Sequence, residues 1–221
     1  MSEPIPGAEL SDWQLTALAK RLYGEGPRLT WHQTLTTVYR PFYAQFGLIL
    51  HWIPPGATML DLGCGSGVLL HLAHALKRLT KGYGVDPQAQ PLRIAEAINR
   101  DPRLMFSRRA DLPIDLMPEC TVIALVDILH HVPAAAKWPL LQGLIDHTAR
   151  GTTLIIKDLD PRPRWRALAN RITDYLSTRS RVDYLAMAEA EAFLRQNGVE
   201  VLFARRWNKY VWSNYLVVAR R

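Results

Sequence analysis

After Pro54-Pro55-Gly56, short apolar runs alternate with stretches of helix length, and this alternation constrains the fold of the 221-residue chain more than any other feature. Strands that alternate with helices are typical of βαβ units, which build a parallel sheet. The apolar runs predict strands at residues 58–62, 82–86, 104–107, 121–127 and 152–158. The spacing of apolar residues predicts helices between them, at residues 67–79, 88–100 and 134–149.

The two ends of the chain follow other patterns. Residues 1–55 are rich in aromatic side chains and favour helices, the first of them capped by Ser11. After residue 158 we expect helices near 163–178 and 186–197. Two last strands, about 199–206 and 212–219, are joined too closely for a parallel crossover and therefore predict an antiparallel hairpin.

The expected fold is therefore α/β: a doubly wound, seven-stranded, mostly parallel sheet with an antiparallel last strand and a helical N-terminal cap. The expected domains are the cap at residues 1–55 and a Rossmann-like domain at residues 56–221.

Composition narrows the class of protein. With 48% apolar and 21% charged residues, the chain can bury a sizeable core. No apolar run approaches the roughly 20 residues that span a bilayer, and the first residues lack the pattern of a secretory signal. The two cysteines, Cys64 and Cys120, fit neither a disulfide framework nor a zinc cluster. We therefore expect a cytoplasmic protein with no integral membrane segment and no bound metal.

The net charge of +7 comes mostly from arginine, which presents a planar fork suited to carboxylate or phosphate. Such an excess is compatible with nucleic acid, anionic lipid or an acidic protein as partner, and equally with a solvated surface. Six of the arginines lie between residues 160 and 181. They either bind a substrate anion or an acidic carrier protein, or cover apolar surface with their aliphatic stems.

The sequence Leu60-Asp61-Leu62-Gly63-Cys64-Gly65-Ser66-Gly67 joins an expected strand to an expected helix. Glycines at such a turn permit positive φ and bring backbone amides close to a ligand at the sheet's carboxyl edge. The spacing is GxGxG, whereas the pyrophosphate fingerprint is GxGxxG. Asp61 would repel a pyrophosphate and favour a ligand with an ammonium or sulfonium group, so a dehydrogenase is the least favoured enzyme.

Two further acids follow the next expected strands. Asp86 stands nineteen residues after Gly67, a distance at which an acid accepts hydrogen bonds from both hydroxyls of a ribose. Asp111 follows the third strand, where it either accepts from an adenine amino group or caps a helix.

Four motifs in this order resemble those of class I S-adenosylmethionine-dependent methyltransferases: LDLGCGSG, GVDP at 84–87, ADLP at 110–113 and ALVDILHHV at 124–132. The resemblance covers roughly residues 56–160 and implies S-adenosylmethionine as cofactor and S-adenosylhomocysteine (SAH) as product. It implies that the methionine part of the cofactor contacts Asp61, Gly63, Cys64 and Gly65. It places Asp86 and Pro87 beside the ribose, Asp111 and Leu112 beside the adenine, and Asp127 near the sulfonium. The alternative for the glycines is an ordinary tight turn.

Methyl transfer is an in-line displacement, so the protein has to align a nucleophile and, for a hydroxyl or an acidic carbon, supply a base. The catalytic candidates are His130, His131 and Asp127; Lys157, Asp158 and Asp160 lie in the same region of the expected sheet. The two histidines are adjacent and point in different directions, so only one is expected to act as base. Alternatively, His131 packs under the cofactor or caps a helix. A metal site of Asp127, His130 and His131 is disfavoured because further ligands are distant in sequence.

The sequence after the fourth strand also bears on the substrate. It reads VDIL and lacks the Asn/Asp-Pro-Pro-Tyr/Phe pattern of enzymes that methylate adenine or a glutamine amide. The form DxLHHVP is closer to small-molecule O- and C-methyltransferases. We therefore expect methyl transfer to a hydrophobic or aromatic small molecule, with an acidic acyl carrier protein as a candidate partner. The alternatives are an RNA methyltransferase and a non-catalytic module that binds S-adenosylmethionine.

Overall fold

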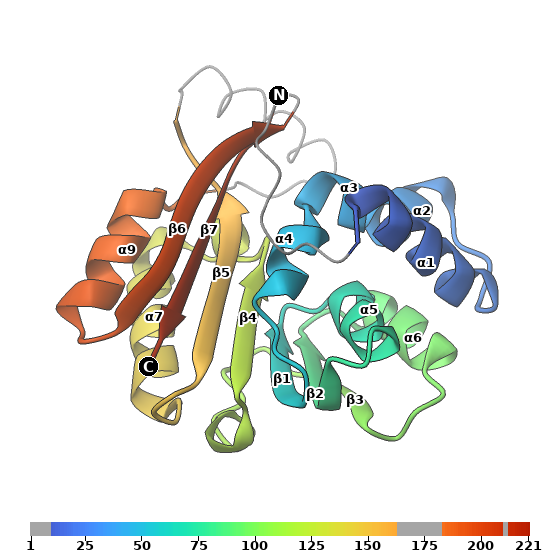
Figure 1. Cartoon of the computed structure of the whole chain (residues 1–221), viewed down its shortest axis with the longest axis horizontal. Coiled ribbons are helices and arrows are strands. Elements are labelled where there is room, and N and C mark those ends of the chain that lie inside the picture. The colour runs from blue at the N-terminus through green and yellow to red at the C-terminus, as the bar shows by residue number, and fades with distance from the viewer. Residues whose placement is uncertain (1–9, 163–182, 210–211) are drawn as a thin grey trace. The chain divides into compact units, whose positions relative to one another are not determined.

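The computed structural model describes residues 10–162, 183–209 and 212–221 (Figure 1). The helices are α1 (Asp12–Gly24), α2 (Trp31–Thr37), α3 (Arg40–Ala44), α4 (Phe46–His51), α5 (Val68–Ala75), α6 (Ala89–Ile98), α7 (Ala134–His147) and α9 (Met187–Gln196). Two 3-10 helices are η1 (Met117–Glu119) and η2 (Leu129–His131). The strands are β1 (Ala57–Leu62), β2 (Leu79–Asp86), β3 (Leu104–Arg108), β4 (Val122–Val126), β5 (Thr153–Leu159), β6 (Glu200–Lys209) and β7 (Trp212–Arg220).

The strands form a seven-stranded sheet in the order β3-β2-β1-β4-β5-β7-β6. The β1–β2, β2–β3 and β4–β5 pairs are parallel, whereas β7 is antiparallel to both β5 and β6. The predicted α/β fold with a reversed last strand is therefore confirmed, and the last two strands form the expected antiparallel pair. The expected helix near residues 163–178 lies outside the described residues.

The chain divides into two compact units, residues 1–110 and residues 111–221. In the first unit, the order of strands is β3-β2-β1, and helices α1 to α4 precede β1. In the second unit, the order is β4-β5-β7-β6. The expected boundary between a cap at residues 1–55 and a catalytic domain at residues 56–221 stays a prediction.

The N-terminal segment is helical, as expected, because its helix starts are capped. Ser11 caps α1 in a capping box with Gln14, and Thr30 caps α2 in the same way with Gln33. Each box satisfies backbone N–H groups that have no partner in the first helical turn. The predicted N-cap at Ser11 is confirmed.

One predicted boundary is wrong: the helix expected at residues 67–79 ends at Ala75, and β2 already begins at Leu79. Lys77 adopts φ +57°, which stops the helix, and its N–H donates to the carbonyl of His74. Leu79 is buried and pairs with Ala57 of β1. Leu79 is therefore apolar because it is buried in the sheet, and it is not part of the apolar face of α5.

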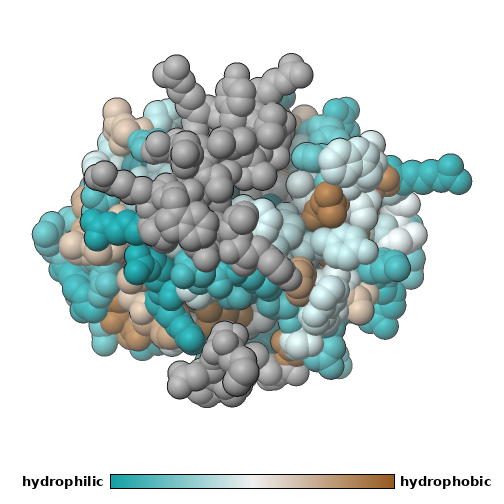
Figure 2. Space-filling view, turned by 90° about the horizontal axis from the view of Figure 1, so that it is seen from above, coloured by the Kyte–Doolittle hydropathy of each residue, from teal (hydrophilic) through white to brown (hydrophobic). Residues whose placement is uncertain are grey.

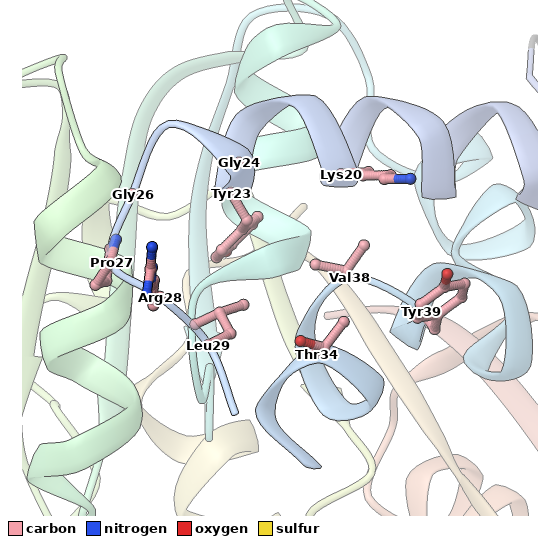
Figure 3. A pocket seen from close by; sticks show the side chains of 10 residues that line it. All are labelled: Lys20, Tyr23, Gly24, Gly26, Pro27, Arg28, Leu29, Thr34, Val38 and Tyr39. Atoms are coloured by element: carbon pink, nitrogen blue, oxygen red, sulfur yellow. The ribbon is translucent and has the colours of Figure 1, made fainter. Parts of the chain in front are cut away.

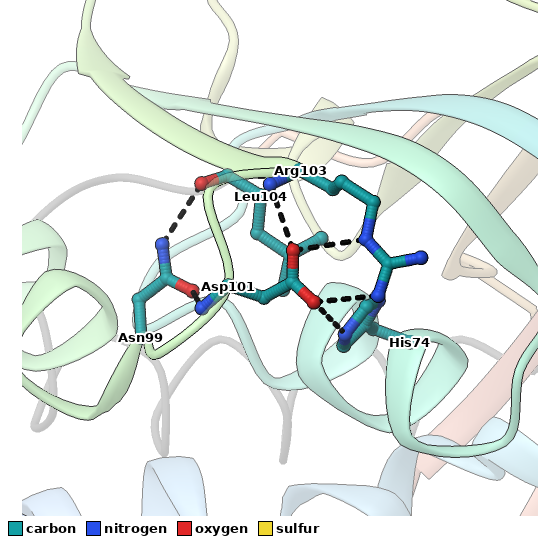
Figure 4. Close-up of polar contacts among 5 residues, drawn as sticks. All are labelled: His74, Asn99, Asp101, Arg103 and Leu104. Atoms are coloured by element: carbon teal, nitrogen blue, oxygen red, sulfur yellow. Dashed lines mark hydrogen bonds and ion pairs between the residues drawn. The ribbon is translucent and has the colours of Figure 1, made fainter.

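The turn that leads into β3 is organised by Asp101 (Figure 4). The Asp101 carboxylate accepts from the backbone N–H, Nε and Nη2 of Arg103 and lies 3.1 Å from Nε2 of His74. The hydrogen bonds from Arg103 lower the pKa of Asp101 well below its ordinary value. Asn99 completes the turn by donating its side-chain amide to the carbonyl of Leu104.

The second unit is built on two buried central strands, which are apolar except at the carboxyl end of β5. All five residues of β4 are buried, as are six of the seven residues of β5. Helices α7 and α9 contact each other through the rings of Trp138 and Phe193, whose centroids lie 4.9 Å apart. Buried strands of this kind read as continuous apolar runs, and for this reason the sequence located them closely.

None of the helices in the described part of the chain combines the length and the apolar character that crossing a bilayer requires.

We expect Gly67→Ala to lower the free energy of unfolding by about 2–4 kcal/mol. Gly67 has φ +74°, and a Cβ there would lie 2.7 Å from the Phe106 ring. Urea denaturation measures the change. Gly151→Ala, at φ +90° with open space around it, isolates the cost of the backbone angle, about 1 kcal/mol. Equal effects at the two positions would show that Phe106 adjusts and the close packing at Gly67 is dispensable.

Candidate functional site

The glycine loop, residues 63–67, turns from β1 into α5 through three left-handed glycines. Gly63, Gly65 and Gly67 have φ of +70°, +56° and +74°. The N–H groups of Gly63 and Cys64 both donate to the carbonyl of Val85, which fixes the start of the loop on β2. A side chain at these angles would be strained, so the path of the turn itself requires the three glycines.

Asp86 joins the end of β2 to this loop. Its carboxylate is buried and accepts from the N–H of Gly65 at 2.9 Å and from the N–H of Gln88 at 2.8 Å. Pro87 is exposed, and its carbonyl accepts from Nε of Arg108. A carboxylate held by two backbone amides keeps lone pairs that can accept from a diol.

Asp61 lies at the carboxyl end of β1 and is only 3% exposed. Burial raises the pKa of its carboxyl, the Arg40 guanidinium opposes that change, and Asp86 adds to it, with a resulting pKa of about 7. Such a carboxyl gains a favourable interaction from a cationic ligand group.

Arg40 is the residue that sequence reasoning missed. It comes from α3 of the N-terminal segment, and its Nη1 lies 3.6 Å from where a Cβ on Gly65 would stand. Its positive charge acts on Asp61, Cys64 and Tyr23. No local pattern marks this arginine, because only the packing of α3 brings it to a loop more than twenty residues away.

The N-terminal segment also holds the loop through hydrogen bonds to Ser66. The Tyr23 hydroxyl donates to the carbonyl of Ser66 at 2.5 Å, and the hydroxyls of Thr37 and Ser66 share a hydrogen bond of 2.9 Å. Tyr23, Thr37 and Ser66 are all buried. The first helices therefore fix the glycine loop and contribute more than apolar packing.

Cys64 is predicted to contact the cofactor, yet its side chain is 5% exposed and packs toward Gly84. Burial raises the pKa of its thiol well above the ordinary value. The thiol is therefore protonated at neutral pH, while the N–H of Cys64 donates to Val85 and its carbonyl accepts from Gly67.

The structure places Asp111 and Leu112 at the start of the second unit. Asp111 is exposed, and no helix of the described chain starts directly after it, so helix capping does not account for this acid. Leu112 is half-buried and packs close to Gly143 of α7.

Asp127 and Lys157 form a pair at the carboxyl ends of β4 and β5. The Lys157 ammonium lies 2.5 Å from Oδ1 of Asp127, and Lys157 is 2% exposed. Asp127 has φ +58°, a left-handed angle that ends β4. A non-glycine residue at such an angle often marks a functional position.

The two histidines have different environments, as expected from their adjacency. His130 is buried, and its Nδ1 lies 2.5 Å from Oδ1 of Asp158, whose Oδ2 also accepts from the backbone N–H of His130. His131 is exposed, although its ring centroid lies 4.1 Å from that of His130. Asp158 therefore fixes the ring of His130 only.

Asp160, the remaining acid of this region, has a structural role. Its buried carboxylate accepts from the N–H groups of Arg162 and Met187. Nearby on β7, the hydroxyls of Ser213 and Tyr215 are buried and have no hydrogen-bond partner among the described residues. Burial raises the pKa of the Tyr215 hydroxyl well above its ordinary value. Within the described ranges, no three His, Cys, Asp or Glu side chains are grouped so that they could hold a metal ion.

We expect the raised pKa of Asp61 to make folding stability depend on pH. The unfolded carboxyl ionises near its ordinary value of 3.8, whereas the folded one stays protonated up to about 7. The favourable contribution of Asp61 to the free energy of unfolding is therefore complete below about pH 4. It is lost as the pH rises through 7. Relative to Asp61→Asn, wild-type stability should fall by a few kcal/mol between about pH 4.5 and 7.5, because each pH unit between the two pKa values contributes about 1.4 kcal/mol.

Urea denaturation at several pH values provides this measurement, and Asp146→Asn, at an exposed acid of α7, is the matched control. The raised pKa of Asp61 would be contradicted if wild type and Asp61→Asn differed in free energy of unfolding by the same amount at about pH 4.5 and about pH 7.5.

Comparisons with known proteins place this geometry in a family. The family model described as a methyltransferase domain matches residues 31–202. Among curated proteins, none matches the chain. Magnesium protoporphyrin IX methyltransferase from Synechocystis PCC 6803, solved with bound SAH, is 21% identical, with a TM-score of 0.65 and 91% of each chain covered.

Two other solved structures are similar in fold. One of them comes from the complex of the Haloferax volcanii Trm112 methyltransferase activator with its partner. The matching chain is 16% identical, with a TM-score of 0.68, and the match covers 96% of this chain and 97% of that one. A tRNA methyltransferase from Bacillus subtilis is 14% identical, with a TM-score of 0.56, covering 79% of this chain and 64% of that one. Since the family model spans more than half of the sequence, the chain belongs to the methyltransferase domain family.

Proposed function

We propose that this protein transfers a methyl group from S-adenosylmethionine to an oxygen or carbon of a hydrophobic or aromatic small molecule. The observation that carries the proposal is the buried Asp86 carboxylate bound to the N–H of Gly65 in a loop of left-handed glycines. This arrangement places a diol acceptor beside the glycine loop, and the neighbouring Asp61 favours a cationic ligand.

The residues of the first unit fit the cofactor by charge. The amino-acid part of S-adenosylmethionine carries an ammonium and a carboxylate, for which Asp61 and the Arg40 guanidinium are complementary partners. Asp86 is suited to the ribose hydroxyls. A pyrophosphate would meet two buried carboxylates, Asp61 and Asp86, and is therefore disfavoured. When bound, the cofactor supplies an electrophilic methyl group on a sulfonium.

In the second unit, His130 has the features of a general base. A carboxylate that accepts from Nδ1 fixes the tautomer of an imidazole and leaves proton transfer to Nε2. Asp158 is then a positioning residue, because it orients His130 without touching the substrate. The pairing with Lys157 orients Asp127 at the end of β4, the position at which the family resemblance puts the sulfonium.

The substrate class rests on the motif after β4. The sequence Asp127-Ile128-Leu129-His130-His131 lacks the pattern of adenine-directed enzymes. The similarity to a porphyrin methyltransferase supports a small molecule, whereas the net charge of +7 and the similarity to a tRNA methyltransferase support RNA as the second candidate. A cytoplasmic location and an acyl carrier protein as partner stay predictions.

We expect Asp86→Ala to weaken binding of S-adenosylmethionine and SAH at least about 30-fold, because the ribose loses its acceptor and Gly65 loses its anchor. Isothermal titration calorimetry of wild type and variant with S-adenosylmethionine, SAH and NAD measures this directly. Asp115→Ala, at an exposed acid after β3, is the control. Binding of NAD alone, or equal affinities in a folded Asp86→Ala protein, would refute the cofactor assignment.

We expect His130→Ala to lower turnover by about 10²- to 10⁴-fold with little change in cofactor affinity, and His131→Ala to have a small effect. Formation of SAH is followed with panels of phenols, carboxylic acids and total tRNA as acceptors. Asp158→Asn should shift the pH profile of turnover, which loss of packing alone would not do. If His130→Ala retains full turnover with an active acceptor, the base lies elsewhere.

A further inference from the structure

The N-terminal helices expose large apolar side chains on their outer side. Trp31 and Leu35 of α2 are 77% and 45% exposed, Tyr39 is 38% exposed and Trp13 of α1 is 62% exposed. We call these four residues the cap surface. Figure 2 shows pale side chains, which are intermediate in hydropathy, and a few brown ones among teal ones on the side where α1 to α3 lie. Single exposed apolar residues are common, but an exposed group on one short segment calls for an explanation.

Helical spacing groups the exposed residues within each helix. Trp31 and Leu35 are four residues apart and share one side of α2, and Tyr39 follows the end of α2 as the N-cap of α3. On α1, Trp13 and Lys20 are seven residues apart and also share a side. The ring of Trp13 contacts Phe42 of α3 at 4.2 Å.

The cap surface is bordered by positive charge. Lys20 and Arg28 line a cleft of about 250 Å³ together with Tyr39, Thr34 and Val38 (Figure 3). Both cationic side chains are exposed. The sequence contains no aspartate or glutamate between Glu25 and Asp61. The surface is therefore apolar and aromatic with cations beside it, and acids are absent from the whole stretch that forms α2 and α3.

We propose that the cap surface binds the interface of an anionic lipid bilayer. Tryptophan and tyrosine favour the headgroup region because their rings are apolar with a polar edge, and leucine reaches the acyl chains. Lysine and arginine at the rim attract anionic headgroups. Single-stranded RNA could also bind to cations and aromatic rings. However, the side chain of Leu35, which lies between Trp31 and Tyr39 in the sequence, has no flat face on which a base can stack. Lipid therefore fits the set better.

This surface goes beyond the methyltransferase reaction and does not depend on it. Lipid contact needs the cap surface with Lys20 and Arg28, whereas cofactor binding is proposed to depend on Asp61 and Asp86. If either proposal fails, the other can still be tested. Vesicle binding is measured without cofactor, and cofactor affinity is measured without vesicles.

Sedimentation with sucrose-loaded vesicles provides the test, using phosphatidylcholine alone and a 3:1 mixture of phosphatidylcholine and phosphatidylglycerol. We expect the protein to bind the anionic vesicles and not the neutral ones. Trp31→Ser/Leu35→Ser should lower the partition coefficient at least about tenfold. Lys20→Gln/Arg28→Gln should lower it about tenfold as well and remove the difference between the two lipids.

Met105→Ser is the matched control, since Met105 is 40% exposed on β3, outside the cap surface, and its loss should leave partitioning unchanged. Circular dichroism and thermal melting establish that each variant is folded. Absence of wild-type binding to anionic vesicles overturns the proposal, and so does binding that Trp31→Ser/Leu35→Ser leaves intact.

Two other occupants of the surface give distinct results. Without vesicle binding, RNA affinity that Trp31→Ser/Leu35→Ser abolishes would assign the surface to RNA. A dimer in light scattering that the same variant dissociates would assign it to a second copy of the chain. Either result overturns the lipid proposal.

Discussion

The hydrogen bond from the N–H of Gly65 to the Asp86 carboxylate is the contact on which the glycine loop depends. It joins the turn after β1 to the end of β2, and the loop can form it only because Gly65 adopts a left-handed angle. The carboxylate is buried, so leaving it without donors would cost more than the bond itself contributes. The carboxylate that stabilises the turn is thus the one that we propose as the acceptor for a ribose.

The N-terminal helices complete this arrangement with contacts that a sequence pattern does not reveal. Tyr23 and Thr37 bind Ser66 of the loop, and Arg40 brings a positive charge to Asp61, which also senses the charge of Asp86. Two carboxylates close together without such a cation would repel each other and disfavour the folded loop. The N-terminal helices therefore hold the glycine loop in place through polar contacts as well as apolar packing.

The features predicted from the sequence are those set by local patterns: the buried strands, the caps and the positive-φ glycines. Contacts between residues far apart in the sequence could not be predicted in this way. The pairing of His130 with Asp158 joins positions 28 apart, and nothing near either residue distinguishes that carboxylate from Asp160, which instead binds backbone amides. The end of α5 was misjudged because Leu79 suits a helix face and a buried strand equally well, and only the left-handed angle at Lys77 decides between them.

The segment that carries the cap surface is also the segment that reaches the glycine loop. Tyr39 is exposed, and its neighbour Arg40 directs its guanidinium to Gly65, while Thr37 is buried against Ser66. One short stretch of backbone thus has an outer side suited to an apolar environment and an inner side bonded to the loop. The hydrogen bond of Thr37 to Ser66 and the approach of Arg40 to Gly65 both come from residues at the end of α2 and the start of α3. The exposed side of this stretch can therefore vary without loss of these contacts only as long as α2 and α3 keep their backbone path.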